Sequence, residues 1–230
     1  MPKPLPQLKP NETALLIIDM QNDFCRQDGY FGRVRGRDMK NVMHIIPKIA
    51  ELLDFTRRNG ITSIFIKTIH SKHTDSEVWT SRLVDDSGIL LNQTNRHPAD
   101  ALCALGSTGA EIVDELQPNL DEPVVIKHRY SSFVQTDLEL MLRIKGIKNV
   151  LVTGNATNVC VESTARHAFM LDFLTVTVSD CVATSDSHGV HESSLLNLEG
   201  YFGYVAPSDK VLKALGVANL AVDAHRVSRS

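Results

Sequence analysis

Short runs of apolar residues alternate along the chain with longer segments whose apolar positions recur at helical spacing. The apolar runs predict strands at residues 14–19, 61–68, 122–128, 149–154 and 174–180. The amphipathic segments predict helices near residues 42–59 and 136–145, and a further helix after Gly154. Strands that are apolar on both faces and separated by helices are typical of a parallel sheet that is covered on both sides.

This alternation predicts an α/β fold, a doubly wound and mostly parallel sheet of about six strands with helices on both faces. At 230 residues, 43% of them hydrophobic, the chain can bury a full core and fits one domain better than two. We expect a single domain over residues 1–230, with its core at about residues 14–205. The segment from His70 to Gly109 predicts a long loop region near the functional site.

Composition and charge narrow the classes of function. The net charge of −3 provides no large basic field, so no nucleic-acid partner is expected. The N-terminal segment contains only a short apolar run, which predicts neither a signal peptide nor a membrane span, and we expect a cytoplasmic protein with no membrane partner. The cysteines are widely scattered without a CxxC pair, which favours free thiols at Cys25, Cys103, Cys160 and Cys181.

Candidate chemistry lies where the predicted strands end, because ligands of open parallel sheets bind beyond the carboxyl ends of the strands. The residues at these ends are Asp19, His70, Lys127 and Cys160. A helix that Thr157 or Asn158 caps would begin beside Cys160, and its dipole together with Lys127 would lower the pKa of the thiol. Asp19 would accept the thiol proton, and backbone N–H groups of the turn GNAT would bind an oxyanion.

Each of these residues alone also has a structural interpretation. A buried cysteine at a helix start is most often a small core residue, an aspartate at a strand end usually caps a turn, and a lysine there usually extends to water. Asp19, Lys127 and Cys160 together favour a catalytic interpretation. We predict structural roles for Cys25, Cys103 and Cys181.

Five segments resemble the isochorismatase-like cysteine hydrolases, a superfamily that includes nicotinamidases, N-carbamoylsarcosine amidohydrolase, ureidoacrylate amidohydrolase and biuret hydrolase. In chain order they read ALLIIDMQNDFC, VIKHRYSSFVQTDLELML, NVLVTGNATNVCVESTARHAF, VSDCVATSD and NLEGYFGYV. The resemblance spans Ala14 to about Val205. The third and fifth segments are most similar to the ureidoacrylate enzymes, whereas TDLELML is also similar to biuret hydrolases. Cys160 distinguishes the chain from isochorismatase itself, a vinyl-ether hydrolase that needs no thiol.

The resemblance implies a catalytic triad of Asp19, Lys127 and Cys160, with Asp19 as proton shuttle and Cys160 as nucleophile. It also implies a cis peptide bond at Asn155–Ala156 and an oxyanion hole formed by the backbone N–H groups of Ala156 and Cys160. The expected substrate-binding residues are Asn22, Phe24, His70, Trp79, Arg129, Tyr130, Phe133 and Glu199. Glu199 would accept hydrogen bonds from a urea-type NH2 group, but a solvent-facing glutamate before a glycine turn fits the same sequence equally well.

One departure from the nicotinamidase pattern concerns metal binding. Nicotinamidases use an Asp-x-His and a further His, whereas this chain reads Thr68, Ile69, His70 at the corresponding place. His70 and His73 have a spacing that suits part of a ligand set, but no acidic residue lies between them. We therefore expect no metal and no cofactor.

The resemblance implies a metal-independent amidohydrolase that cleaves a small ureido or carbamoyl amide through a thioester at Cys160, with release of ammonia or carbamate. Two alternatives remain open. One is a nicotinamidase-like or isochorismatase-like hydrolase of another small substrate, and the other is a catalytically silent binding module of this fold. Members of the superfamily often form dimers or tetramers, so the expected partners are a small-molecule amide and further copies of the chain.

Overall fold

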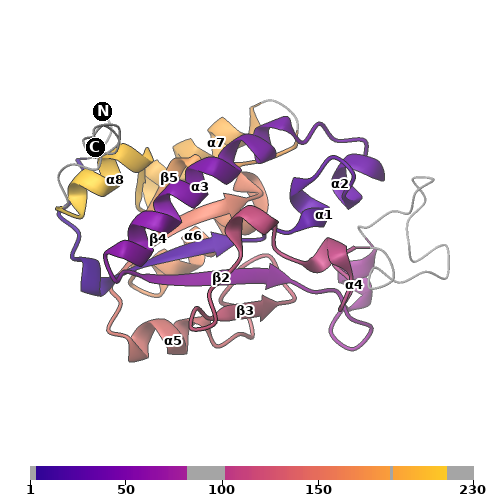
Figure 1. The fold of residues 1–230 in the computed structure, drawn as a ribbon, viewed down its shortest axis with the longest axis horizontal. Coiled ribbons are helices and arrows are strands. Elements are labelled where there is room, and N and C mark those ends of the chain that lie inside the picture. Colours follow the sequence, from indigo (N-terminus) through magenta and orange to yellow (C-terminus); the bar gives the residue numbers. More distant parts are fainter. Residues whose placement is uncertain (1–3, 82–101, 187–188, 217–230) are drawn as a thin grey trace, which may run out of the picture.

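A computed structural model describes residues 4–81, 102–186 and 189–216 of the chain. Its centre is a six-stranded sheet in the order β3-β2-β1-β4-β5-β6, and all neighbouring strands are parallel (Figure 1). The strands are β1 (Thr13–Ile18), β2 (Thr62–Thr68), β3 (Val124–Lys127), β4 (Asn149–Asn155), β5 (Leu174–Ala183) and β6 (Tyr204–Ala206). The order reverses direction between β1 and β4, which confirms the predicted doubly wound α/β fold.

Helices cover both faces of this sheet. One face packs against α3 (Lys40–Arg58) and α8 (Ser208–Ala214), and the other against α5 (Leu138–Ile144) and α6 (Glu162–Met170). The remaining regular segments are α1 (Asn22–Cys25), α2 (Tyr30–Arg33), α4 (Glu77–Thr80), α7 (Val190–Asn197), the 3-10 turns η1 (Pro10–Glu12), η4 (Thr108–Ala110) and η5 (Asp114–Leu116), and the π-helical turns η6 (Thr157–Val161) and η7 (Leu198–Phe202).

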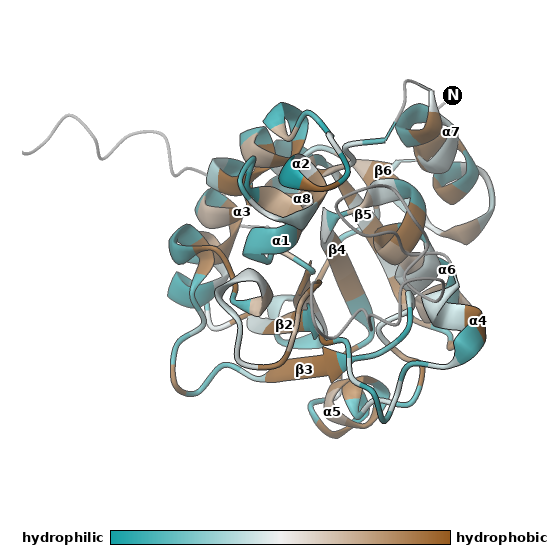
Figure 2. Cartoon of the chain, turned by 90° about the vertical axis from the view of Figure 1, so that its right-hand side faces the viewer, coloured by the Kyte–Doolittle hydropathy of each residue, from teal (hydrophilic) through white to brown (hydrophobic). Residues whose placement is uncertain are grey.

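The strands supply side chains to two separate cores. All six residues of β1 are buried, but Leu15 and Ile17 join the core under α3, whereas Leu16 and Ile18 join the core under α5 and α6. Successive side chains of a strand point to opposite faces, so a continuous apolar run is what a strand buried on both faces requires. Figure 2 shows these hydrophobic strands enclosed by helices whose outer surfaces carry hydrophilic residues.

In Figure 1 the arrows of β2 and β3 point toward the end of the molecule where α1, α2 and α4 lie. Because all neighbouring strands are parallel, this end is the carboxyl edge of the sheet. The predicted helix at 42–59 corresponds to α3, and the one at 136–145 corresponds to α5. The strand β6 was not among the predicted segments, because three half-buried or buried residues are too short a run to show a pattern. Of the predicted loop region 70–109, residues 82–101 lie outside the described residues, and the remainder contains α4. In the part of the chain that the structure describes, no helix combines the length and apolarity needed to cross a membrane.

We predict that Gly154 is indispensable to the pairing of β1 with β4. Its φ is +112°, and a Cβ there would lie 2.1 Å from the carbonyl oxygen of Ile18. Gly154→Ala should lower the free energy of unfolding by more than about 3 kcal/mol, because two paired strands would have to separate. Gly146→Ala is the matched control, since Gly146 has φ +67° but open space around it, and it should cost about 1 kcal/mol. Urea unfolding measures both, and equal losses would contradict the prediction.

Candidate active site

Asp19, Lys127 and Cys160 come from three different strand ends and meet at the carboxyl edge of the sheet. Asp19 directly follows β1, Lys127 is the last residue of β3, and Cys160 lies in η6 after β4. Lys127 Nζ lies 2.8 Å from Asp19 Oδ2 and 3.4 Å from Cys160 Sγ. The structure thus brings together the three residues that the sequence singled out.

Thr68 links the two charged residues of this group. β2 lies between β1 and β3, so Lys127 reaches Asp19 across the end of β2, where Thr68 is its register partner. The Thr68 hydroxyl donates to Asp19 Oδ1 at 3.0 Å and accepts from Lys127 Nζ at 2.7 Å. The buried Gln21 amide fixes the Thr68 backbone, donating to its carbonyl and accepting from its N–H. The sequence analysis missed Thr68, although its place at a strand end was a usable signal.

The Lys127 ammonium is buried, and each of its three N–H bonds has an acceptor. Its side chain is 1% exposed, and it also donates to the Arg129 carbonyl oxygen at 3.1 Å. With the hydrogen bonds to Thr68 Oγ1 and Cys160 Sγ, this makes three acceptors for its three N–H bonds, and the contact with Asp19 Oδ2 is an ion pair. Burial lowers the pKa of Lys127, but Asp19 and Cys160 more than offset this effect and raise the pKa above its usual value. This raised pKa favours the charged form of Lys127 beside the sulfur.

The pKa of the Cys160 thiol lies above its usual value, so the expectation of a lowered pKa is wrong. Burial raises the pKa of Cys160, the negative charge of Asp19 raises it further, and Lys127 offsets only part of the effect. The α-helix that was expected to stabilise a thiolate begins at Glu162, after the cysteine, because Cys160 itself lies in the π-helical turn η6. Ionisation of Cys160 therefore requires a nearby group that takes its proton.

Neither Thr157 nor Asn158 caps a helix here, so that prediction is also wrong. Both side chains instead bind the segment that follows β5. Thr157 Oγ1 lies 2.9 Å from His191 Nδ1, and Asn158 Nδ2 donates to Asp186 Oδ2 at 2.8 Å. These two contacts hold η6, the turn that carries Cys160, against Asp186 and His191.

The sulfur faces a cavity of about 270 Å³ at the sheet edge. Ala156 lines it as well, and the peptide bond between Asn155 and Ala156 is cis, at the position that the resemblance implies. Of the predicted substrate-binding residues, five line this cavity: Phe24, His70, Trp79, Arg129 and Tyr130. Aromatic rings form much of its wall, with the Trp79 and Tyr130 ring centroids 4.5 Å apart.

Three predicted substrate-binding residues do not line the cavity. The Asn22 amide donates to the Thr108 carbonyl oxygen and holds a loop. Phe133 is 8% exposed and packs in the core against the rings of His167 and Phe173. Glu199 lies in η7, which packs against α6 on one face of the sheet and not at its carboxyl edge. The sequence pattern placed these residues near the motifs but did not determine where their side chains point.

His70 is engaged with a carboxylate that the sequence analysis did not consider. Its Nδ1 lies 2.8 Å from Asp75 Oδ2, and both side chains are buried. His73 is exposed. Within residues 4–81, 102–186 and 189–216, no three His, Cys, Asp or Glu side chains converge as a metal site requires.

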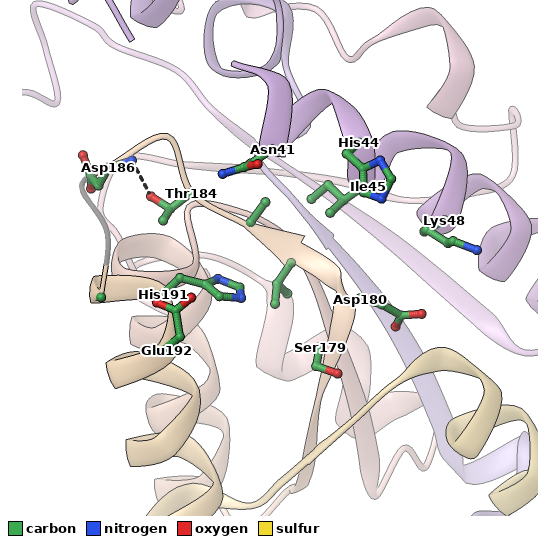
Figure 3. Close-up of a pocket in the computed structure, with 13 residues that line it drawn as sticks. Asn41, His44, Ile45, Lys48, Ser179, Asp180, Thr184, Asp186, His191 and Glu192 are labelled. Atoms are coloured by element: carbon green, nitrogen blue, oxygen red, sulfur yellow. Dashed lines mark hydrogen bonds between the residues drawn. The ribbon is translucent and has the colours of Figure 1, made fainter. Parts of the chain in front are cut away.

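A second hollow of about 300 Å³ lies beside the first, between α3, the end of β5 and α7 (Figure 3). Its side chains are mainly polar, and Thr184 and Asp186 border both hollows. Asp19, Lys127 and Cys160 are absent from its lining. The cavity next to Cys160 is therefore the candidate active site.

Comparison with known proteins agrees with this geometry. A family profile described as "Isochorismatase domain" matches residues 13–210. A ureidoacrylate amidohydrolase, RutB, from Stutzerimonas stutzeri (strain A1501) is 32% identical over 228 residues, which cover 94% of this chain and 88% of the relative. A cysteine hydrolase structure from Pseudomonas syringae pv. phaseolicola 1448A has a TM-score of 0.78 at 26% identity, covering 94% of this chain and 99% of the other. An isochorismatase family protein from Desulfovibrio vulgaris has a TM-score of 0.73 at 30% identity, covering 90% and 99%.

The charge relations predict how Cys160 reacts with iodoacetamide. Asp19→Asn removes the negative charge that raises the pKa of the thiol, so alkylation of Cys160 at pH 8 should become about tenfold faster or more. Asp38→Asn, a change of an exposed carboxylate, should leave the rate unchanged. Mass spectrometry of labelled peptides measures the rates. Slower labelling of Cys160 in Asp19→Asn would contradict the effect of the Asp19 charge on the pKa of the thiol. Labelling should not occur at Cys25, Cys103 or Cys181, because all three are buried.

Proposed function

The chain belongs to the isochorismatase family, and from this premise we propose that it is a cysteine-dependent amidohydrolase of a small ureido or carbamoyl amide. The observation that carries the proposal is the Lys127 ammonium, placed between the Asp19 carboxylate and the Cys160 sulfur beside a cavity. The relatives named ureidoacrylate amidohydrolase support a ureido substrate. The proposed products are the amine and carbamate where the substituted nitrogen leaves, or ammonia and the N-substituted carbamate where the terminal NH2 group leaves.

The first step is attack of Cys160 Sγ on the ureido or carbamoyl carbonyl carbon. Asp19 takes the thiol proton as the sulfur–carbon bond forms, so one negative charge beside Lys127 is exchanged for another. Because the number of buried charges stays constant, the raised pKa of Cys160 does not prevent the transfer. Lys127 holds the sulfur and the carboxylate in place throughout.

The tetrahedral adduct then collapses. The negative oxygen is bound by the backbone N–H groups of Ala156 and Cys160, in the cis-peptide turn. Asp19 passes its proton to the leaving nitrogen, the carbon–nitrogen bond breaks, and a thioester remains on Cys160. Asp19 next takes a proton from water, whose oxygen attacks the thioester carbon, and the returning proton restores the thiol.

Two alternatives predict different observations. A nicotinamidase-like enzyme would depend on a metal, but His70 is paired with Asp75 in this chain. A silent binding module would have no use for a buried lysine, because a buried cation is costly unless its site needs it. The arrangement of Asp19, Thr68, Lys127 and Cys160 therefore favours the amidohydrolase.

Substitution of the nucleophile tests the proposal. Cys160→Ser should reduce ammonia release from ureido compounds by at least about a thousandfold, because a serine hydroxyl has a far higher pKa than a carboxylate base can overcome. Cys181→Ala, which changes a buried cysteine away from the cavity, should stay within about tenfold of the wild type. Intact-protein mass spectrometry during turnover should detect the acyl adduct on Cys160. Normal turnover by Cys160→Ala would refute the mechanism.

Chelation tests the metal-independent form of the mechanism. Dialysis against EDTA should leave the turnover rate unchanged, because every group in the proposed steps belongs to the chain itself. Elemental analysis of the purified protein provides the parallel measurement and should find no stoichiometric zinc. Loss of activity in EDTA, with recovery on addition of a divalent ion, would favour the nicotinamidase-like alternative.

A further inference from the structure

One buried acid–base pair at the cavity wall has no part in the proposed steps. His70 Nδ1 lies 2.8 Å from Asp75 Oδ2, and the two side chains are 5% and 0% exposed. Asp75 Oδ1 is also buried, and it has no hydrogen-bond partner in the described part of the chain. A buried carboxylate with one oxygen unpaired is costly, and such a cost is typical of groups that serve a functional site.

The backbone after β2 presents His70 to the same cavity as Thr68. The His70 N–H donates to the Cys103 carbonyl oxygen in an isolated parallel bridge, so the chain stays extended past the end of the strand. Side chains two residues apart on an extended chain lie on the same side. Thr68 and His70 accordingly both line the cavity, whereas Ile69 packs in a separate apolar cluster. His70 is therefore the next residue along the wall from the Thr68 hydroxyl that binds Asp19.

Asp75 decides which hydrogen bond the His70 ring can form with a ligand in the cavity. A carboxylate only accepts, so the proton of the neutral imidazole lies on Nδ1 and Nε2 is left as an acceptor. No residue within the described ranges forms a hydrogen bond with Nε2. The cations of the same wall, Arg35, Lys127 and Arg129, can only donate. His70 thus supplies an acceptor to a wall whose charged groups supply donors.

We propose that His70 is a further catalytic residue, whose Nε2 accepts a hydrogen bond from the water that attacks the thioester, and that Asp75 is its positioning residue. The inference rests on the proposed function and concerns only the second half of the reaction. The thiol needs no such group, because Lys127 Nζ already donates to the Cys160 sulfur. Water has two O–H bonds, and Asp19 takes the proton of only one. An acceptor for the other bond directs a lone pair of the oxygen at the thioester carbon.

This step balances with His70 neutral throughout. The water oxygen forms a bond to the thioester carbon, one water proton passes to Asp19, and the carbon–sulfur bond breaks. The proton on Asp19 then returns to the sulfur of Cys160, and the second water proton leaves with the acid product. His70 therefore holds the water without gaining or losing a proton.

Acetylation of Cys160 by 4-nitrophenyl acetate tests the role of His70 separately from any ureido substrate. The burst of 4-nitrophenolate measures acylation, and intact-protein mass spectrometry measures the decay of the acetyl-enzyme in water. In His70→Asn, acylation should stay within about twofold of the wild type, whereas the decay should be at least about tenfold slower. The asparagine amide keeps a donor for Asp75 but does not extend to the position of Nε2.

Two further variants are matched to His70→Asn. His70→Gln carries an amide oxygen that reaches the position of Nε2, so it should restore the decay of the acetyl-enzyme to within about threefold of the wild type. His73→Asn makes the same change at an exposed histidine and should behave like the wild type. Decay in His70→Gln as slow as in His70→Asn would overturn the role of an acceptor at Nε2.

Hydroxylamine separates a lost water contact from a distorted site. It is a stronger nucleophile than water, so it should remove the acetyl group from His70→Asn and from the wild type at rates within about twofold of each other. Equal decay of the two acetyl-enzymes in water would overturn the inference. An equal slowing of acylation, of decay in water and of decay in hydroxylamine would overturn it as well, because a purely structural role predicts that result.

The positioning role of Asp75 has its own test. Asp75→Ala should also slow the decay in water, but it should add less than about twofold in the His70→Asn background, because Asp75 acts through His70. A larger further loss would overturn this role. If no ureido compound releases ammonia in a Cys160-dependent way, the proposed function fails, while the decay of the acetyl-enzyme still decides whether His70 directs the water.

Discussion

The buried contact between Lys127 and Asp19 is the interaction on which the rest of the site depends. Both side chains are 1% exposed, and an ammonium taken out of water is costly unless a carboxylate and further hydrogen bonds replace the lost solvent. Removal of either partner would leave an unpaired buried charge, which typically costs about 3–5 kcal/mol. The pair exists only if β1, β2 and β3 keep their order and register, because Lys127 must cross β2 beside Thr68. The ion pair between Lys127 and Asp19 therefore depends on the topology of the sheet.

The same contact explains why a protonated thiol suits this site. A free thiolate at Cys160 would add a second negative charge beside Asp19, and the raised pKa of the thiol reflects its burial first and that repulsion second. Movement of the proton from Cys160 to Asp19 keeps a single negative charge beside Lys127. The cost of ionisation falls because the charge moves over a short distance and no new charge is created. Lys127, with its raised pKa, stays cationic in both states.

The charge along the cavity wall changes with distance from the Lys127–Asp19 pair. Next to Cys160, Lys127 is paired with Asp19 and also donates to the sulfur, so one cation contacts both groups. Farther along the wall, Arg35 and Arg129 present positive charge without a carboxylate partner in the described residues. The rings of Trp79 and Tyr130 pack against each other in this part of the wall.

The sequence by itself determined the fold class and singled out three candidate residues that the structure brings together. Apolar runs separated by amphipathic segments require a parallel sheet covered on both faces, and parallel strands bring their carboxyl ends to one edge. That reasoning sufficed to place Asp19, Lys127 and Cys160 near one another, since each follows or ends a strand. The local sequence pattern is sufficient for this prediction, because the alternation and the burial of side chains along a strand depend on residues that are close together in the chain.

Only the tertiary structure decided the rest. Thr68 bridges Asp19 and Lys127 because of the strand order, and Phe133 faces the core and not the cavity because of the packing against His167. The pKa of Cys160 depends on burial and on charges that come from other strands, so the local helix signal gave the wrong direction. Such properties arise from residues far apart in the chain, and their distances are set by the packing of the whole sheet.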